Sequence, residues 1–384
     1  MTVREISQPP PTTPIQTKKL DHPDSLAATI PTEGEHTVST QLSVIGDALV
    51  EYLRPHWHKD ITCTDISQIP GGASRETWRV KLLVDGAAQG VILRRDPPSS
   101  LIDTERAHEF NTYKAVFGTA VPVPEPLVLE DKNPAGLLRP FSITREVPGC
   151  EASPALLAMP PFAAHRQQIG ERKWTIMGQL AALDVDALAL DFMQRPLHPA
   201  THELNYWANV IDQDALHPQP IAQAAVRWLR RNLPAQPTKL ALVHGDFRSG
   251  NFLYDAHGNI HAVLDWEMAH IGDPLEDLAW SFDPLWCWPE KTLAGNLLPR
   301  AEALAIWERA SGLTVDRKAF RWWQIFAAVK AIAIWISSAE DYVNGTTKEP
   351  ILAFAGWPLI DRQNRILLDH LSPESRHLYA EAPL

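Results

Sequence analysis

The sequence reads LVHGDFRSGN at residues 242–251 and VLDWE at residues 263–267, and these two stretches decide the fold. They supply an aspartate, Asp246, an asparagine five residues later, Asn251, and a second aspartate, Asp265, beyond a turn. Phosphoryl transfer from ATP needs such a set, because one carboxylate can orient an attacking hydroxyl while the asparagine and the second carboxylate hold the metal ions that bridge the phosphates. The spacing therefore predicts a catalytic Asp246 and two metal ligands, Asn251 and Asp265.

Short apolar runs around these residues indicate how their side chains meet. Residues 239–243, 252–254 and 260–264 favour strands, and the segment between the last two, DAHGN, is rich in turn formers. A loop followed by a hairpin would return the asparagine and both aspartates to the mouth of one cleft. Their hard oxygen ligands suit Mg²⁺, which takes one or two ligands from protein and the rest from phosphates and water. ATP and Mg²⁺ are therefore the expected cofactors.

Both stretches resemble motifs of the kinase-like phosphotransferases, specifically the superfamily of aminoglycoside phosphotransferases and choline kinases. His244-Gly245-Asp246 stands where protein kinases carry His-Arg-Asp, and Asp265-Trp266-Glu267 stands where they carry Asp-Phe-Gly. The resemblance covers roughly residues 66–280. It implies an α+β, two-lobed protein-kinase-like fold with a small β-rich N-lobe and a larger, mostly helical C-lobe. It also places Arg248 where protein kinases carry a catalytic-loop Lys, where it would stabilise charge on the transferring phosphoryl group.

Upstream, residues 66–95 alternate between β-leaning runs and turns, which is typical of the small lobe of the kinase fold. The first turn contains Gly71, Gly72 and Ser74. Because glycine allows close approach of the backbone, this turn is expected to bring N–H groups to phosphate oxygens. A plain Gly-Gly hairpin is the alternative for the turn taken alone.

The third β-leaning run, VILRR at residues 91–95, should supply a cation to the α- and β-phosphates, where protein kinases use Lys. If Ile92 points inward, strand alternation puts Arg94 on the same face, and which of Arg94 and Arg95 contacts phosphate stays open. A helix is expected over residues 102–117, and the resemblance pairs its Glu109 with the strand cation. Glu105, one turn earlier on the same face, is the alternative. The Arg in place of Lys is similar to the branch of kinase-like domains fused to acyl-CoA dehydrogenases, and its guanidinium can bind phosphate in a fork.

The run expected to form the hinge between lobes is FSITREV at residues 141–147. The resemblance implies that the carbonyl of Glu146 and the N–H of Val147 bind the adenine edge, because Pro148 has no N–H to donate. We therefore divide the chain into an N-lobe, residues 41–147, and a C-lobe, residues 148–384.

Residues 1–40, rich in Pro, Thr and Ser, are expected to form a mobile leader. Apolar spacing after the leader predicts a helix over residues 42–53. Within the C-lobe, the same reasoning predicts helices over the segments 169–183, 205–211, 221–233, 301–310 and 319–338.

Three further C-lobe residues carry expectations. By resemblance, Asp277 accepts hydrogen bonds from the backbone of the catalytic loop, and Asp273 caps the helix that follows it. Lys330 lies in an apolar helix, where a Lys either extends its ammonium to solvent or meets an anionic substrate group.

Composition excludes several classes of partner. The net charge of −11 argues against nucleic acid or an anionic membrane as the main partner, and no uninterrupted apolar stretch approaches the roughly 20 residues of a membrane span. The N-terminus has no signal-peptide core, and the three cysteines, Cys63, Cys150 and Cys287, have no metal or disulfide spacing. We expect a cytoplasmic protein; its oligomeric state cannot be read from the sequence.

Together these observations predict an ATP-dependent phosphotransferase that moves the γ-phosphoryl group to a hydroxyl of a small-molecule alcohol. The dehydrogenase-associated branch implies a hydroxyacyl compound, and the 14 Trp residues hint at a partly apolar pocket. The alternatives are an aminoglycoside as acceptor, a nucleotide-binding pseudokinase, and a metallohydrolase that uses His244, Asp246 and Asp265 as ligands. The lone histidine argues against the last.

Overall fold

The computed structural model describes residues 33–69, 76–95, 104–132, 139–287, 290 and 292–372. The expected phosphate turn with Gly71, Gly72 and Ser74 lies outside the described residues. Contacts between Cα atoms divide the chain into two units, Met1–Gln41 and Leu42–Leu384, and the second unit contains all of the predicted site residues.

Helix α1 (Glu33–Trp57) crosses the boundary between these units. The helix expected from residue 42 therefore begins earlier, inside the segment assigned to the leader, and runs one turn further at its C-terminal end. Apolar periodicity predicted the part of the helix in which Ile45, Leu49 and Leu53 are buried.

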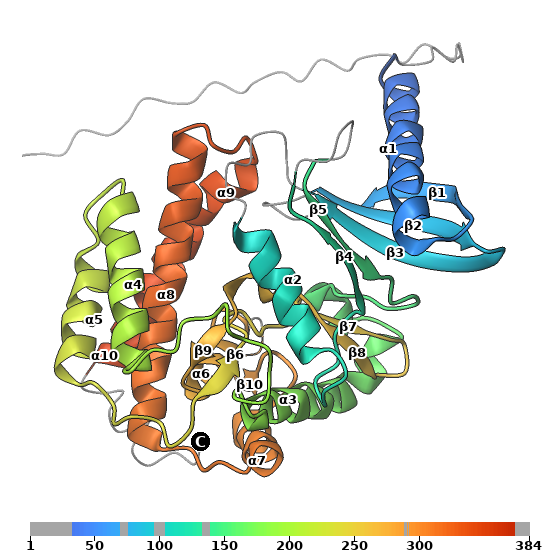
Figure 1. The fold of residues 1–384 in the computed structure, drawn as a ribbon. Coiled ribbons are helices and arrows are strands. Elements are labelled where there is room, and N and C mark those ends of the chain that lie inside the picture. The colour runs from blue at the N-terminus through green and yellow to red at the C-terminus, as the bar shows by residue number, and fades with distance from the viewer. Residues whose placement is uncertain are drawn as a thin grey trace, which may run out of the picture. The chain divides into compact units, whose positions relative to one another are not determined.

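The N-lobe is built on a five-stranded antiparallel sheet in the order β1-β2-β3-β5-β4 (Figure 1). Its strands are β1 (Ile61–Ile69), β2 (Glu76–Val84), β3 (Ala87–Arg95), β4 (Pro126–Glu130) and β5 (Phe141–Arg145). In β2, Trp78, Val80, Leu82 and Val84 are buried and the residues between them are exposed, as expected for a strand with one face on a core. Helix α1 packs against the same core.

Between β3 and β4, the chain forms α2 (Thr104–Val116), which contacts the helical turn Trp266–Met268 just beyond Asp265. This contact joins the N-lobe helix to the segment that carries the predicted metal ligand. It also buries Tyr113, whose hydroxyl accepts a hydrogen bond from the N–H of Asp265 at 3.1 Å.

The C-lobe is mostly helical, with short paired strands that present the catalytic segments. Its helices are α3 (Arg166–Ala182), α4 (Pro199–Asp214), α5 (Pro220–Arg231), α6 (Leu275–Ser281), α7 (Arg300–Ser311), α8 (Arg317–Val343), α9 (Pro350–Phe354) and α10 (Ile360–Leu371). The strands pair as β6 (Ala241–Val243) with β9 (His270–Gly272), β7 (Phe252–Tyr254) with β8 (Ile260–Val263), and β10 (Leu293–Ala294) with β11 (Leu298–Pro299). In Figure 1, α8 runs between α4 and α5 on one side and α6 on the other.

Helix α8 is the one described helix long and apolar enough, by length and composition, to cross a membrane. However, 72% of its most apolar window is buried inside the protein, where it contacts α4, α5, α6 and α10. The core helix of a soluble protein passes the same test, and this burial accounts for the hydropathy of α8 by packing.

The predicted fold class, α+β with a β-rich N-lobe and a helical C-lobe, is confirmed. The strands and helices expected from the sequence all form. Most ends are shifted by a few residues, and α1 begins nine residues before its predicted start at residue 42. Helices α9 and α10 were not predicted, although α10 buries Ile366 and Leu367 on one face. The hinge strand ends at Arg145, so Glu146 and Val147 lie just beyond it.

Candidate active site

The catalytic loop begins where β6 ends, and its first two peptide groups are held by one buried carboxylate. Asp277, from α6, accepts hydrogen bonds from the N–H of His244 at 2.6 Å and of Gly245 at 2.9 Å. Burial raises the pKa of Asp277, while His244 and its backbone N–H oppose that rise. The expectation that Asp277 anchors this loop is confirmed. Asp273 also caps α6, because its side chain accepts a hydrogen bond from the N–H of Leu275 at 2.9 Å.

The ring of His244 fastens the catalytic loop to the segment that precedes Asp265. Its Nδ1 accepts a hydrogen bond from the N–H of Asp246 at 3.1 Å, so the proton lies on Nε2, which donates to the carbonyl of Leu264 at 2.8 Å. The ring is fully buried. These contacts account for both nitrogens, and His244 therefore serves as an anchor and not as an acid, a base or a metal ligand.

The carboxylate of Asp246 faces three hydrogen-bond donors. Its Oδ1 accepts from Nε1 of Trp280 at 2.7 Å, its Oδ2 from Nδ2 of Asn251 at 2.7 Å, and both oxygens lie 3.2 Å from Nε of Arg248. Donors on every side fix the orientation of this carboxylate. The guanidinium of Arg248 also stacks over the ring of Trp286 at 5.0 Å.

The hairpin formed by β7 and β8 returns the chain to this loop. The N–H of Leu264 donates to the carbonyl of Asn251 at 2.8 Å. One local hairpin therefore brings together the two predicted metal ligands, Asn251 and Asp265. Nδ2 of Asn251 is engaged by Asp246, and its Oδ1 has no hydrogen-bond partner in the described part of the chain. Asp265 adopts a left-handed backbone conformation, with φ at 61°, and its side chain is 43% exposed.

Strand β3 supplies the cation of the site. Arg94 forms an ion pair with Glu109 of α2, and its NH1 lies 3.3 Å from Oδ1 of Asp265. Burial opposes the charge of Arg94, but Glu109 and Asp265 outweigh that effect and raise its pKa. Arg95 points to the other face of the sheet and pairs with Glu76 at 2.6 Å. Strand alternation had predicted this division of the two arginines.

One cleft of about 800 Å³ lies between the sheet and the catalytic segments. Asp246 does not line it, but Asp246 is bonded to Arg248 and Asn251, which do. Glu146 and Val147 line it at the hinge; the N–H of Glu146 donates to the carbonyl of Gly90 at 3.0 Å, and its side chain binds Arg79 at 2.7 Å. Within the described residues, the carbonyl of Glu146 and the N–H of Val147 have no partner. The predicted site residues that line the cleft are Arg94, Glu109, Glu146, Val147, Arg248, Asn251 and Asp265.

Comparison with known proteins agrees with this geometry. The model of the phosphotransferase enzyme family matches residues 65–313, which is most of the chain and includes both catalytic stretches. The chain belongs to the phosphotransferase enzyme family. Together with the neighbours below, this membership supports a small-molecule phosphotransferase.

Among curated proteins, this phosphotransferase family member is similar to human acyl-CoA dehydrogenase family member 11, with 30% identity over 254 residues, 63% of this chain and 31% of that protein. Mouse acyl-CoA dehydrogenase family member 10 is 28% identical over 250 residues, 64% of this chain and 22% of that protein. The chain thus spans less than a third of the length of these relatives.

Solved structures share the fold at low sequence identity. A Ralstonia eutropha protein described provisionally as an aminoglycoside phosphotransferase superposes with a TM-score of 0.69 at 20% identity, over 84% of this chain and 97% of that one. Macrolide 2'-phosphotransferase type I gives 0.55 at 16% identity over 85% and 97%. A choline/ethanolamine kinase family protein from Mesorhizobium loti gives 0.53 at 17% identity over 82% and 91%.

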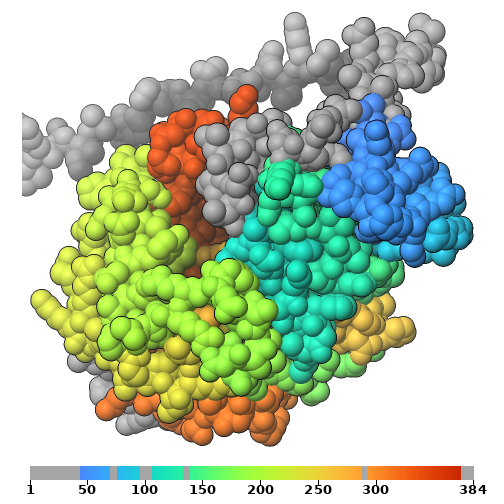
Figure 2. Space-filling view, in the orientation of Figure 1, coloured from blue at the N-terminus to red at the C-terminus, as the bar shows by residue number. Residues whose placement is uncertain are grey.

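A second recess, of about 700 Å³, is bordered by the segment that follows Asp265. Its lining comes from α2, α4, α8 and residues 267–270, and Figure 2 shows the surface hollowed between yellow-green α4 and teal α2. Aromatic and apolar residues share the wall with carboxylates. The lining includes Glu203, Tyr206, Trp207, Glu267, Met268, His270, Lys330, Ile334 and Asp341.

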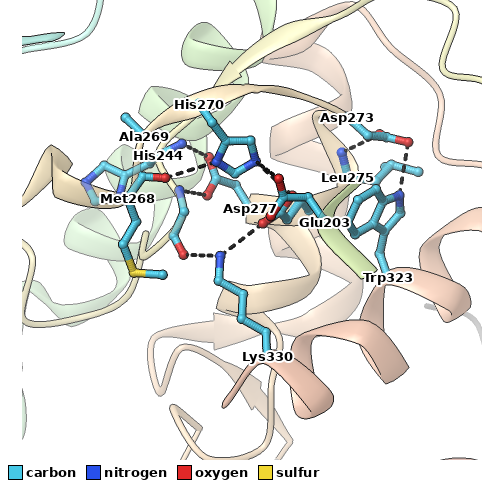
Figure 3. Close-up of polar contacts among 12 residues, drawn as sticks. Glu203, His244, Met268, Ala269, His270, Asp273, Leu275, Asp277, Trp323 and Lys330 are labelled. Atoms are coloured by element: carbon cyan, nitrogen blue, oxygen red, sulfur yellow. Dashed lines mark hydrogen bonds and ion pairs between the residues drawn. The ribbon is translucent and has the colours of Figure 1, made fainter. Parts of the chain in front are cut away.

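Sequence reasoning missed a charged cluster at the floor of this recess (Figure 3). His270 lies 3.1 Å from Oε2 of Glu276 and 3.7 Å from Oε1 of Glu203, and Lys330 lies 3.0 Å from Oε1 of Glu276. The prediction that Lys330 extends to solvent is wrong, since the residue is 1% exposed. The available clue was Glu276, next to Asp277 in the GDPLEDLAW segment, because a carboxylate that becomes buried needs a cation.

The cluster predicts a pH dependence of stability. Burial opposes the charge on His270, but Glu276 and Glu203 outweigh it and raise its pKa from 6.5 to about 10. A histidine with a raised pKa stabilises the folded state fully below about pH 6.5, the value in the unfolded chain, and the contribution disappears as the pH rises through about 10. The free energy of unfolding, measured with urea from pH 6 to 10, should therefore fall with pH, and less steeply in a His270→Gln/Glu203→Gln variant. Equal slopes would contradict the assignment.

A further cavity, of about 960 Å³, lies among α5, α7 and the start of α8. It contains none of the predicted site residues, so we do not assign the active site to it. Asp273, at the N-terminal end of α6, lines this cavity. Burial raises the pKa of its carboxyl to about 6, although hydrogen bonds from Leu275 and Trp323 oppose the rise.

Proposed function

We propose that the protein transfers the γ-phosphoryl group of ATP to a hydroxyl group of a small molecule. The observation that carries the proposal is the direct hydrogen bond between Asp246 and Asn251, together with the ion pair of Arg94 and Asp265. Asn251, Arg94 and Asp265 line one cleft that reaches the hinge. A positioning carboxylate, two oxygen ligands for a metal and a phosphate-binding cation are the parts that phosphoryl transfer uses.

The polar groups of the cleft fit a nucleotide and a divalent ion. The N–H of Val147 and the carbonyl of Glu146 offer a donor and an acceptor to adenine, and Arg94 offers its guanidinium to the phosphates. Asn251, through Oδ1, and Asp265, through its half-exposed carboxylate, would hold Mg²⁺, because hard oxygen ligands suit this ion. When bound, Mg²⁺ offsets the negative charge of the β- and γ-phosphates.

Asp246 orients the acceptor. Its carboxylate is fixed by Trp280 and Asn251, so an acceptor hydroxyl that donates to it is aligned for attack. An aspartate is a weak base toward an alcohol, and it can receive the proton late because the transition state is loose. Arg248, between Asp246 and the cleft, stabilises charge that develops on the transferring group.

We propose the second recess as the place of the acceptor and a hydroxyacyl compound as its class. Tyr206, Trp207, Met268 and Ile334 give the recess an apolar wall, and the curated relatives are acyl-CoA dehydrogenase family members. The carboxylates of Glu203, Glu267 and Asp341 favour the second candidate, a polycationic aminoglycoside.

ADP release, coupled to a panel of hydroxyacyl compounds, aminoglycosides and simple alcohols, tests the proposal. We expect Mg²⁺-dependent turnover with the hydroxyacyl compounds. Turnover with aminoglycosides alone would support the second candidate. Binding of ATP without turnover on any member of the panel would identify a pseudokinase and contradict the proposal.

Substitutions of the two adjacent arginines test how the nucleotide is held. Arg94→Lys should raise the KM for ATP about tenfold, or about 1.4 kcal/mol, because an ammonium cannot contact Glu109 and phosphate with the geometry of a guanidinium. Arg95→Lys, one residue along the strand and on its other face, is the matched control and should leave the KM unchanged. Equal effects of the two changes on the KM would contradict a phosphate contact by Arg94.

A further inference from the structure

The cluster of Glu203, His270 and Glu276 has the composition of a metal site, since one ligand atom from each lies within 4.8 Å of the others. However, hydrogen bonds within the cluster argue against a bound metal ion. Nδ1 of His270 lies 3.0 Å from the carbonyl of Met268 and its Nε2 lies 3.1 Å from Glu276, and both of these partners are acceptors. Both ring nitrogens must therefore carry protons, which leaves no lone pair for a metal.

Lys330 completes the charge balance of the cluster. Its ammonium donates to Oε1 of Glu276 at 3.0 Å. Two cations, on β9 and α8, therefore face two carboxylates, on α4 and α6 (Figure 3). Among the described residues, the ammonium of Lys330 also donates a hydrogen bond to the carbonyl of Gly245, 2.8 Å away. The rings of Trp207 and Trp280 lie 5.5 and 5.3 Å from the same nitrogen and exclude water from it.

The carbonyl of Gly245 belongs to the peptide group that leads into Asp246. That peptide is confined from a second side as well, because a Cβ at Gly245 would lie 2.5 Å from the carbonyl oxygen of Met268, and Gly245 itself has φ at 84°. Lys330 thus fixes the orientation of a peptide that has little other freedom, directly before the carboxylate that faces the acceptor.

We infer that Lys330 is a positioning residue of the catalytic loop, and that Glu203, His270 and Glu276 form a charge-balanced support for its ammonium instead of a metal site. The support spans the recess and the loop: His270 and Glu203 border the recess, and Lys330 contacts the peptide next to Asp246. The part of this inference that concerns turnover rests on the proposed function.

The decisive comparison is between a single and a double variant. Lys330→Met leaves Glu276 without one of its cations and should lower the melting temperature. Lys330→Met/Glu276→Gln removes one charge of each sign and should recover the melting temperature, yet kcat should stay about ten- to a hundredfold below wild type while the KM for ATP changes less than twofold. Recovery of kcat together with the melting temperature would show a purely structural role and overturn the inference.

Two readouts do not depend on turnover. Amide hydrogen exchange at Gly245, Asp246 and Phe247 should be faster in the double variant than in wild type, and unchanged exchange would overturn the inference even if no acceptor is found. Titration of the wild-type protein with Zn²⁺ should reveal no site that His270→Gln removes; a site lost in that variant would identify a metal centre. If wild type fails to turn over any acceptor while exchange behaves as expected, the proposed function fails and the positioning contact stands.

Discussion

Asp246→Asn is expected to lower kcat by about a hundred- to ten-thousandfold and to leave the affinity for Mg-ATP nearly unchanged. The carboxylate can accept the acceptor hydroxyl and later its proton, whereas an amide cannot take the proton. All three polar neighbours of this side chain, Trp280, Arg248 and Asn251, are donors. An amide nitrogen in their midst meets a donor whichever way the side chain turns, so the variant loses orientation as well as basicity. Single-turnover kinetics with saturating Mg-ATP measures this loss directly.

Binding and stability separate the chemical effect from damage to the loop. Calorimetric titration with Mg-ATP should match wild type closely, because the nucleotide contacts proposed at Arg94 and Val147 are untouched. Thermal unfolding should show a cooperatively folded protein whose melting temperature is lowered by the unpaired amide donor. Asp186→Asn, at an exposed carboxylate paired with Arg195, is the control for an isosteric change at a surface ion pair and should retain full activity. A folded Asp246→Asn protein that keeps more than a tenth of the wild-type kcat would rule out the catalytic role of this residue.

The local part of this site could be predicted from the sequence because it is built by short-range geometry. One strand, one loop and one hairpin join Asp246, Asn251 and Asp265, and turn formers mark where the chain reverses. Strand alternation separated Arg94 from Arg95 for the same reason, since the direction of a side chain in a strand depends only on its parity.

The rest of the site depends on long-range packing that no local pattern encodes. Lys330 contacts Gly245 and Glu276 across the C-lobe, and nothing near it in sequence predicts an acid at that place. The local sequence around a lysine in an apolar helix is the same whether its ammonium reaches solvent or a buried carboxylate. His270 is similar, because its charge depends on Glu203 of a distant helix. The start of α1 was missed because the sequence of residues 33–41 has little apolar periodicity.

Asp265→Asn is the second change with a large expected effect, because it removes the charged ligand proposed for Mg²⁺. A metal ion that offsets phosphate charge contributes several kcal/mol to transition-state stabilisation, so a loss of about 4 kcal/mol, or about a thousandfold in kcat, is expected. Asn suits this position, since Asp265 has φ at 61° and asparagine tolerates the left-handed region better than most residues. Steady-state assays over a range of Mg²⁺ concentrations should also show that more Mg²⁺ is needed for half-maximal activity.

A matched control comes from Asp85, which also has a positive φ, 51°, in the turn between β2 and β3. Its half-exposed carboxylate binds the N–H of Asp60 at 3.0 Å and lies far along the sheet from the cleft-lining residues. Asp85→Asn therefore repeats the same chemical change on the same kind of backbone and should alter neither kcat nor the Mg²⁺ requirement. Arg94 keeps its ion pair with Glu109 when Asp265 is replaced, so the cation stays in place and the loss can be ascribed to the metal ligand. If Asp265→Asn were as active as Asp85→Asn at low Mg²⁺, the metal would have to be held elsewhere in the cleft.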